Sequence, residues 1–372
     1  MFTLTFSNIM LWLAGLFFLI QLMFYVFIYL RISVKGKREA ETNDLKPLSV
    51  VICARNEEQN ILNYLPKILA QDYPKFQVIL INDRSWDETW DVMEAMARKD
   101  ERITLVNIPD SGKDGFAKKF ALTVGIKAAK HDQLIFIDAD CYPETDQWLK
   151  KMASKFSTQK RVVLGAGAYL KHKGLTNKLI RFDTCTIAAQ YLSFAKAGIP
   201  YMGVGRNLAY KNELYDSVRG FKSHYHIPSG DDDLFVNEVA DSQNTTICFE
   251  PDAITFSEPE ETFRDWRIQK RRHMTTGKFY KMKHKLLLGL FPLSYVLFLV
   301  FAIIAGVTNP FWYIPLTMIG VRLILQYAAN WRVFKTMQSK DVFWMIPAYE
   351  LIMLILNPYL SLTGNKYNKL RL

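Results

Sequence analysis

Cysteine is scarce in this 372-residue sequence, which contains only four, and histidine is little commoner at six. No Cys-x-x-Cys pair and no Cys/His group with metal-ligand spacing occurs, so neither a zinc site nor a disulfide framework is indicated. The sequence also contains no internal repeat and no low-complexity segment. Scattered thiols of this kind fit the reducing environment of the cytosol. The four are Cys53, Cys141, Cys185 and Cys248.

Basic residues are absent from the first eight positions, MFTLTFSN, although an almost unbroken apolar run follows at 9–30. A cleaved signal peptide would begin with a basic region and have a shorter apolar core. The run is instead long enough to cross a hydrocarbon layer of about 30 Å as a helix. We therefore predict a retained transmembrane anchor in residues 1–34, with its apolar part at 8–30.

Basic residues follow this anchor directly, in a polar segment that we interpret as a linker at 35–46. The tendency of cytoplasmic flanks to be positive places the next domain in the cytoplasm and the N-terminus outside. A second basic stretch, within 258–285, precedes another apolar region and predicts an interfacial segment. The residues behind the anchor are Arg31, Lys35, Lys37 and Arg38.

The C-terminal region, 286–372, contains three further apolar segments. Arg322 and Glu350 lie inside the last two and argue against simple crossings. Four crossings in total would also leave a basic tail outside, against the charge rule, so the number of crossings stays open. The net charge of +11 fits contact with anionic lipid headgroups better than nucleic-acid binding. The predicted spans are 286–307, 311–329 and 342–362.

Between the apolar ends, strand-like runs alternate with helical ones, which predicts an α/β domain with a mainly parallel sheet at 47–257. Ligands bind at the carboxyl ends of the strands in such sheets. Asn56, Asp83 and Asp138 all follow predicted strands. The predicted strands are 48–54, 76–81, 103–107 and 134–137, and the predicted helices are 58–70, 89–99 and 118–130.

The run LIFIDAD at 134–140 is the most informative stretch, because it ends a buried strand with Asp138 and Asp140. Two carboxylates at this spacing can hold a hard divalent ion, which shares its oxygen ligands with a substrate's phosphates. Asp-x-Asp also arises by chance, and aspartate is common in turns. The pair alone therefore predicts only a candidate site for Mg²⁺ or Mn²⁺.

Four further motifs accompany this pair, in the order ICARNEE, LINDRSWDET, SGDDDLFVN and QKRRH, at 52–58, 80–89, 229–237 and 269–273. With them, residues 47–280 resemble the inverting, processive-type family 2 glycosyltransferases and the ceramide glucosyltransferase-like enzymes. The resemblance implies a GT-A type nucleotide-sugar-binding domain, flanked here by transmembrane helices. It also implies a metal-dependent hexosyltransferase that uses a nucleotide-diphosphate sugar, usually a UDP-sugar.

The resemblance assigns donor-binding roles to a set of residues at the strand ends. An Asn-Glu pair equally suits a helix N-terminus, and the alternative for Asp83 is an Asx-turn built by Asn82 or Asp83. The phosphate-facing lysine stays open among Lys118, Lys119 and Lys113. The implied donor residues are Ala54, Arg55, Asn56, Glu57, Asp83, Lys118, Asp138, Gln269 and Arg272, and the metal residues are Asp138 and Asp140.

The catalytic base is predicted in the acidic run at 231–233, because an inverting transfer needs one carboxylate beside the acceptor hydroxyl. Asp231 and Asp232 are both candidates, and the alternative is a solvated acidic loop. On the acceptor side the resemblance implicates Gly205, Arg206 and Asn207. His273 stands where the family's Q-x-x-R-W element has tryptophan, which favours transfer of a single sugar.

These expectations converge on a membrane-bound inverting glycosyltransferase whose acceptor is a lipid or a lipid-linked glycan. Two alternatives stay open. One is a processive polysaccharide synthase that extends and exports its product. The other is a catalytically inactive membrane scaffold that binds a sugar nucleotide.

Overall fold

A computed structural model of the protein describes residues 5–34, 45–109 and 117–363. Its centre is a seven-stranded sheet in which β1 is flanked by β2 and β4, and the mainly parallel sheet predicted from the sequence is confirmed. Among the described strands of this sheet, only β8 runs antiparallel to its neighbours, β4 and β6. In spatial order the strands are β3 (Ile103–Ile108), β2 (Phe76–Asp83), β1 (Leu48–Ala54), β4 (Gln133–Phe136), β8 (Leu208–Lys211), β6 (Val162–Leu164) and β9 (Thr245–Ile247).

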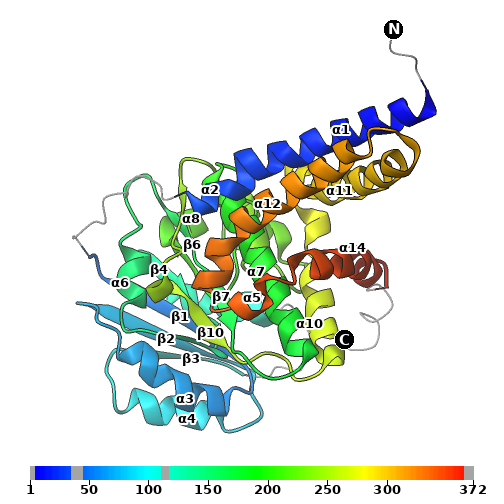
Figure 1. Ribbon diagram of the computed structural model, residues 1–372. Coiled ribbons are helices and arrows are strands. Elements are labelled where there is room, and N and C mark those ends of the chain that lie inside the picture. Colours follow the sequence, from blue (N-terminus) through cyan, green and yellow to red (C-terminus); the bar gives the residue numbers. More distant parts are fainter. Residues whose placement is uncertain (1–4, 35–44, 110–116, 364–372) are drawn as a thin grey trace.

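Helices cover both faces of this sheet (Figure 1). Successive strand residues point to opposite faces, so Val50 packs in a cluster with α3 while Val51 packs in another with α5. Both valines are fully buried, which explains why the strand sequences read as continuous apolar runs. The helices of this half are α3 (Glu58–Leu69), α4 (Thr89–Ala97), α5 (Ala117–Lys127) and α6 (Trp148–Ala153).

A second, three-stranded sheet stands beside the first in the order β5-β10-β7. Its first strand, β5 (Cys141–Pro143), begins immediately after Asp140. Strand β10 (Thr255–Ser257) pairs with β5 antiparallel and with β7 (Gly167–Tyr169) parallel. The Asp-x-Asp segment is therefore held between a strand of each sheet.

The second half of the domain is mainly helical around α7 (Leu175–Lys196). Arg181 of α7 is almost fully buried and forms a two-pronged ion pair with Asp341, at 2.9 and 2.6 Å. This pair fixes the domain to the C-terminal helices. The other helices are α8 (Asn212–Ser217), α9 (Asp233–Val239), α10 (Phe263–Met274) and α13 (Lys340–Phe343).

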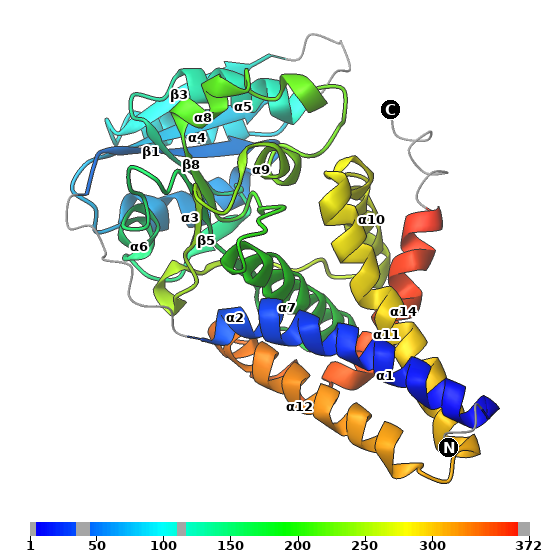
Figure 2. The ribbon, with the colours of Figure 1, turned by 90° about the horizontal axis from the view of Figure 1, so that it is seen from above.

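The N-terminal helix and part of the C-terminal helices project from the domain as a helical bundle (Figures 1 and 2). Helix α1 (Phe6–Phe24) continues through a π-helical segment, η1 (Tyr25–Tyr29), into α2 (Leu30–Ser33), and packs along α11 (Met282–Thr308). Helices α12 (Tyr313–Thr336) and α14 (Ile346–Thr363) lie beside them.

Two helices among the described residues are long and apolar enough to cross a membrane, Phe6–Ser33 and Met282–Thr308. They correspond to the predicted spans at 8–30 and 286–307. The other two predicted spans do not form helices that are both long and apolar enough to cross a membrane. The span at 311–329 lies in α12, which contains Arg322 and Gln326, and the span at 342–362 is divided between α13 and the shorter α14.

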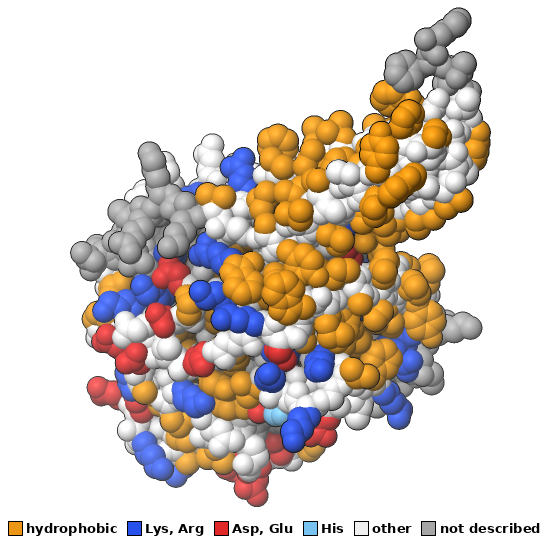
Figure 3. Space-filling view, in the orientation of Figure 1, with side chains coloured by type: hydrophobic (Ala, Val, Ile, Leu, Met, Phe, Trp, Pro, Cys, Tyr) orange, Lys and Arg blue, Asp and Glu red, His pale blue; other side chains and the backbone are white. Residues whose placement is uncertain are grey.

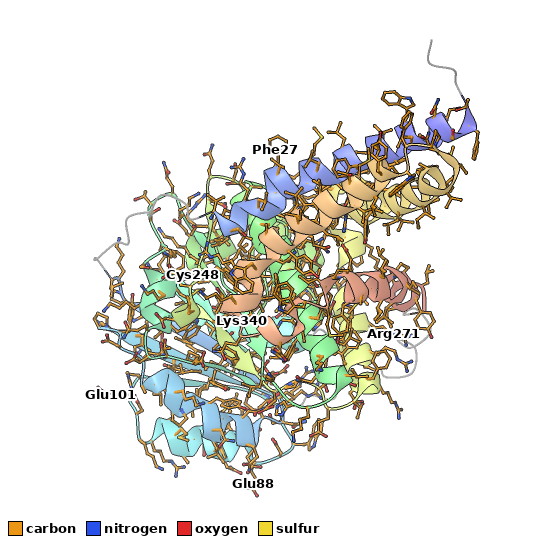
Figure 4. The ribbon with its side chains drawn as sticks, viewed as in Figure 1. Phe27, Glu88, Glu101, Cys248, Arg271 and Lys340 are labelled. Carbon is orange, nitrogen blue, oxygen red and sulfur yellow. The ribbon has the colours of Figure 1, made fainter. Side chains whose placement is uncertain are left out.

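Hydrophobic side chains cover the visible face of the helical bundle, whereas charged side chains of both signs cover the α/β domain (Figure 3). Phe27 is 57% exposed and points outward from the helical bundle. Glu88 and Glu101 lie at the opposite end of the molecule (Figure 4). An exposed apolar surface of this extent marks an interaction with a membrane or with another protein.

Candidate functional site

The predicted donor and catalytic residues meet at one cavity of about 1430 Å³ at the carboxyl ends of β1, β2 and β4. Parallel strands end at the same edge of a sheet, so side chains that follow them converge there. The predicted residues that line the cavity are Arg55, Glu57, Asp83, Lys118, Asp138, Asp140, Gly205, Arg206, Asp231, Asp232, Gln269 and Arg272. Ala54, Asn56 and Asn207 are not among its lining residues.

Asp138 and Asp140 form the candidate metal centre with the buried thiol of Cys141, since one potential ligand atom of each lies within 4.8 Å of the others. Burial raises the pKa of Asp140, and the Asp138 carboxylate raises it further. Burial also raises the pKa of the Cys141 thiol well above its usual value, so the thiol stays protonated. Two carboxylate oxygen ligands fit a hard cation such as Mg²⁺ or Mn²⁺ rather than zinc.

Lys118 connects the candidate metal centre to the acidic run. Its ammonium lies 2.9 Å from Asp138 Oδ1 and 3.3 Å from Asp231 Oδ2. Burial alone would raise the pKa of Asp138, but the Lys118 charge lowers it below its usual value. Burial would likewise lower the pKa of Lys118, but the two carboxylates hold it well above its usual value. Lys118 is therefore a charged group placed between the candidate metal centre and the acidic run.

The neighbouring lysine has a different environment. Lys119 is buried and donates hydrogen bonds to the backbone carbonyls of His224 and Ile227, at 2.6 and 3.0 Å. It thereby anchors the segment that precedes the acidic run. Of the three lysines left open by the sequence, Lys118 alone among the described residues lines the cavity, and Lys113 lies outside the described residues.

The three acids of the run have three different environments. Asp231 faces Lys118. Asp232 caps α9, and its two oxygens accept hydrogen bonds from the backbone N–H groups of Asp233 and Gly205, both at 2.7 Å. Asp233 is buried and accepts hydrogen bonds from the hydroxyls of Tyr280 and Thr276. A solvated acidic loop does not match these environments.

The pKa of Asp232 is raised to about 8. Burial is the main cause, because it penalises the charged carboxylate, and the neighbouring acids Asp231 and Asp233 add to it. A carboxylate whose pKa lies near neutral pH is well suited to general-base catalysis. This property distinguishes Asp232 from an ordinary surface aspartate.

The first two motifs are joined where β1 and β2 end. Asn56 adopts a left-handed backbone with φ of 58°. Its backbone N–H donates to Ser85 Oγ and its side-chain oxygen accepts from the Trp86 N–H, both at 3.0 Å. Asn56 therefore ties the two strand ends together, while Arg55 reaches the cavity and its guanidinium lies 5.5 Å from the Trp86 ring centre. Glu57 is the N-cap residue of α3 but makes no capping hydrogen bond.

Of the two residues considered for an Asx-turn in the second motif, Asn82 makes a local side-chain bond, although its oxygen accepts from the N–H three residues on, that of Ser85, at 3.2 Å. Asp83 instead lines the cavity, and its Oδ1 accepts a hydrogen bond from Arg84 Nε at 3.1 Å. The side chain of Asp83 is only 5% exposed. A carboxylate in this position can accept hydrogen bonds from a base or a ribose.

The acceptor-side loop is held close to both acidic groups. A Cβ on Gly205 would lie 3.3 Å from Asp138 Oδ1 and 3.6 Å from Asp232 Oδ2, so glycine permits this approach. The Arg206 guanidinium stacks 4.6 Å from the Tyr169 ring centre. Its buried Nη1 has no hydrogen-bond partner among the described residues, which leaves one donor for a ligand.

Asn207 does not reach the cavity. It is fully buried, and its side chain donates to the carbonyls of Ala166 and Ala253 and accepts from the Trp148 indole N–H. These bonds fix the backbone that carries Gly205 and Arg206. The pattern of the motif could not separate Asn207 from its neighbours, because its partners are far away in the sequence.

Helix α10 closes the cavity with Gln269, Arg272 and His273. Gln269 accepts a hydrogen bond from the Tyr169 hydroxyl at 3.3 Å. Surrounding protein atoms lower the pKa of His273 to about 4, and the Arg272 charge contributes, so this ring is neutral at neutral pH. Sequence reasoning missed Tyr169, for which no local signal exists.

The environment of His224 predicts that the fold around the acidic run is sensitive to acid. Burial lowers the pKa of His224 to about 4, and the nearby Lys119 lowers it too, although the Glu238 carboxylate lies 3.5 Å from Nδ1. The unfolded chain, with an ordinary histidine pKa near 6.5, takes up a proton that the fold does not. The free energy of unfolding is therefore unaffected by this ring above pH 6.5. It falls as the pH drops toward 4, by on the order of 2–3 kcal/mol for this group.

Thermal unfolding midpoints measured from pH 7.5 to pH 4 test this prediction. We expect the difference between wild type and His224→Gln to shrink as the pH falls, because only the wild type loses stability through this ring. Parallel curves for the two proteins would contradict the assignment.

Residues 49–219 match the sequence model of the family described as Glycosyl transferase family 2. The chain is 26% identical over 289 residues to the probable glycosyltransferase YdaM of Bacillus subtilis, covering 71% of this chain and 64% of YdaM. It is 25% identical over 215 residues to the glycosyltransferase AglE of Haloferax volcanii, covering 57% of this chain and 67% of AglE. The chain thus spans about two thirds of these relatives.

Among solved structures, the mannosyltransferase PcManGT from Pyrobaculum calidifontis, in complex with GDP-Man and Mn²⁺, superposes with a TM-score of 0.59. The superposition covers 96% of this chain and 99% of PcManGT, and the two sequences are 20% identical. At this identity, the likeness shows a shared fold.

Proposed function

We propose that this chain, whose residues 49–219 match glycosyl transferase family 2 and which has a GT-A type fold, is a membrane-bound inverting enzyme of that family. It transfers a sugar from a nucleotide-diphosphate sugar, with UDP as the first candidate nucleotide, to a hydroxyl of a lipid or lipid-linked glycan. The observation that carries this proposal is a single cavity that contains Asp138, Lys118 and Asp232 and continues between the apolar helices.

The cavity residues divide the reaction between them. Asp138 and Asp140 would hold Mg²⁺ or Mn²⁺, whose charge neutralises the diphosphate leaving group. Lys118 and Arg272 line the same cavity and supply positive charge to that diphosphate. Asp232 takes the proton of the acceptor hydroxyl. The acceptor oxygen attacks the anomeric carbon from the side opposite the diphosphate, and the bond to the diphosphate breaks. The product then has the inverted anomeric configuration.

The remaining predicted residues position the donor and the acceptor. Asp83 and Arg55 lie at the end of the cavity formed by β1 and β2, where the base and ribose are proposed to bind. Gln269 is proposed to contact the diphosphate, and Gly205 and Arg206 to border the acceptor. Ala54 and Asn56 are proposed to position the donor site through their backbone. Asn207 is buried and supports the loop that carries Gly205 and Arg206.

We place α1 with η1, and α11, across the membrane, with the catalytic domain on the cytoplasmic side. The support is their length and apolar character and the basic residues that follow the first apolar segment and precede the second. A catalytic domain held at the bilayer by helices on both sides is well placed to receive a lipid acceptor. The interfacial segment at 258–285 then lies at headgroup level.

Two alternatives make different predictions. A processive synthase would release long polysaccharide chains, and His273 in place of the family's tryptophan argues for single transfer instead. A catalytically inactive scaffold has no need for Asp232 to be held by two backbone N–H groups beside the candidate metal centre.

The test offers purified protein in lipid nanodiscs a panel of radiolabelled UDP- and GDP-sugars with Mn²⁺ and a total lipid extract. We expect label in one organic-extractable product that carries a single added sugar, and no transfer after EDTA treatment. Label in a polymer would support the synthase. Metal-dependent donor binding without consumption under any condition would support the scaffold.

Lys118 and Lys119 provide a matched pair of variants. Lys118→Met removes a charge from the cavity, so we expect the donor KM to rise roughly tenfold or more, as for a lost charge-assisted contact, with a smaller fall in the unfolding midpoint than Lys119→Met causes, because Lys118 is partly exposed. Lys119→Met leaves two buried carbonyls without their donor, so we expect a lower unfolding midpoint. Steady-state kinetics and thermal unfolding distinguish the two, and a normal donor KM for Lys118→Met would remove this lysine from the donor site.

A further inference from the structure

The cavity does not end at the donor site. It continues between η1, α11, α12 and α14, which stand together on one side of the domain in Figure 2. We call the part lined by these four elements the membrane arm. If the proposed function holds, the acceptor lipid occupies this arm, and the chemistry of the arm selects the acceptor.

A charged cluster forms one wall of the arm. Arg322 of α12 is 2% exposed and pairs with Glu350 of α14, at 2.7 Å between Nη2 and Oε1 and 3.2 Å between Nη1 and Oε2. Gln21 of α1 accepts a hydrogen bond from Arg322 Nε at 3.1 Å, and the guanidinium lies 3.4 Å from the Tyr295 ring centre. The cluster therefore joins four helices.

A buried ion pair contributes little net stability, because removing both charges from water offsets most of their attraction. Because stability alone does not explain such a pair, a buried ion pair that borders a cavity is a candidate for a functional role. The guanidinium of Arg322 is surrounded by its partners and does not line the cavity, whereas Glu350 does. The arm therefore meets the carboxylate side of the pair.

The other polar groups of the arm are carboxamides. Gln326, Asn330 and Asn357 line it beside Glu350. The side-chain oxygen of Asn357 is buried and has no hydrogen-bond partner among the described residues. No lysine, arginine or histidine of the described chain lines the arm; the cavity's basic residues, such as Lys118 and Arg206, come from the catalytic domain and α10.

This arrangement disfavours a phosphate in the arm. A lipid-linked phosphate or diphosphate is multiply charged and needs cationic partners, which the arm does not offer, and Glu350 would repel it. A hydroxyl can instead donate to Glu350 or to the unpaired oxygen of Asn357. We propose that the membrane arm selects an acceptor lipid with a neutral, hydroxyl-bearing headgroup, such as a diacylglycerol or its glycosylated form, over a lipid phosphate.

The test compares diacylglycerol, glycosyl diacylglycerol and polyprenyl phosphate as acceptors in nanodiscs of zwitterionic lipid, with each UDP- and GDP-sugar of the panel as donor. Wild-type protein is expected to label a neutral lipid at least about tenfold more efficiently than the lipid phosphate, the effect of 1.4 kcal/mol. Glu350→Gln removes the repelling charge and frees Arg322 to attract an anion. It is expected to lower transfer to the neutral lipid and to raise transfer to the phosphate.

Two further variants keep the outcome interpretable. Asp341→Asn breaks the buried ion pair with Arg181, which lies outside the cavity lining, and is expected to leave the acceptor preference unchanged. Asn357→Leu removes the unpaired oxygen without creating a buried charge. It is expected to raise the KM for the neutral lipid, and this result can be read even if Glu350→Gln fails to fold.

The failures are distinguishable. Preferential labelling of polyprenyl phosphate by the wild type would overturn this inference and leave the proposed transferase intact. Hydrolysis of the donor without labelling of any lipid would overturn both the inference and the proposed lipid acceptor. An unchanged preference in folded Glu350→Gln and Asn357→Leu proteins would show that the arm does not select.

Discussion

Asp232→Asn is expected to lower the rate of transfer by about 10²–10⁴-fold, the usual contribution of a positioned general base. The amide has nearly the same shape and can still accept the Gly205 N–H, but it cannot take up a proton. Donor binding and Mn²⁺ binding should persist, because Asp232 is not proposed to contact either. Steady-state transfer rates and equilibrium donor binding, measured on the same preparation, test both parts.

The pH profile gives this prediction a sign. The pKa of Asp232 is raised to about 8 by burial and by its acidic neighbours, and only the ionised carboxylate acts as a base. The transfer rate should therefore rise as the pH increases toward 8 and level off above it, whereas the residual activity of Asp232→Asn should lack this rise. A rate independent of pH from 6 to 9 would contradict the assignment.

The neighbouring acids serve as controls. Asp231 faces the Lys118 charge, so Asp231→Asn should change donor affinity more than the maximum rate. Asp233 is bonded to Tyr280 and Thr276, so Asp233→Asn should lower the unfolding midpoint. The opposite ranking, with Asp231→Asn inactive and Asp232→Asn active, would assign the base to Asp231.

The sequence predicted the part of the fold that local pattern determines. Continuous apolar runs such as the one around Val50 and Val51 exist because both faces of the sheet are covered, and they identify parallel strands without knowledge of the neighbours. The carboxyl ends of those strands then place Asp83 and Asp138 at one edge. That is why the residues from separate motifs meet at one cavity.

Pairing across long sequence distances could not be predicted in this way. The motif at 118–119 contains two adjacent lysines, and only the carbonyls of His224 and Ile227 show which one is buried. In the sequence, Arg322 and Glu350 argue against two of the predicted membrane spans. Their ion pair explains why those segments tolerate charge. The pair depends on the contact between α12 and α14, which the pattern of apolar residues in the sequence does not predict.

Asp140→Asn is the second substitution with a large expected effect. It removes one of two carboxylates from the candidate metal centre and leaves Asp138 paired with Lys118. Since a metal that stabilises a leaving group contributes several kcal/mol, the rate should fall by roughly 10²-fold or more. The affinity for Mn²⁺, measured by calorimetry or by the electron paramagnetic resonance of the free ion, should fall with it.

Cys141→Ser is the matched control, because Cys141 shares the centre without being proposed as a ligand. Its thiol is buried and protonated, since burial and the adjacent carboxylates raise its pKa, and hard cations prefer oxygen over neutral sulfur. Cys141→Ser should therefore keep Mn²⁺ affinity close to wild type. Equal loss of Mn²⁺ in both variants would point to a thiolate site and a softer metal, and full activity of Asp140→Asn in EDTA would exclude a metal from the reaction.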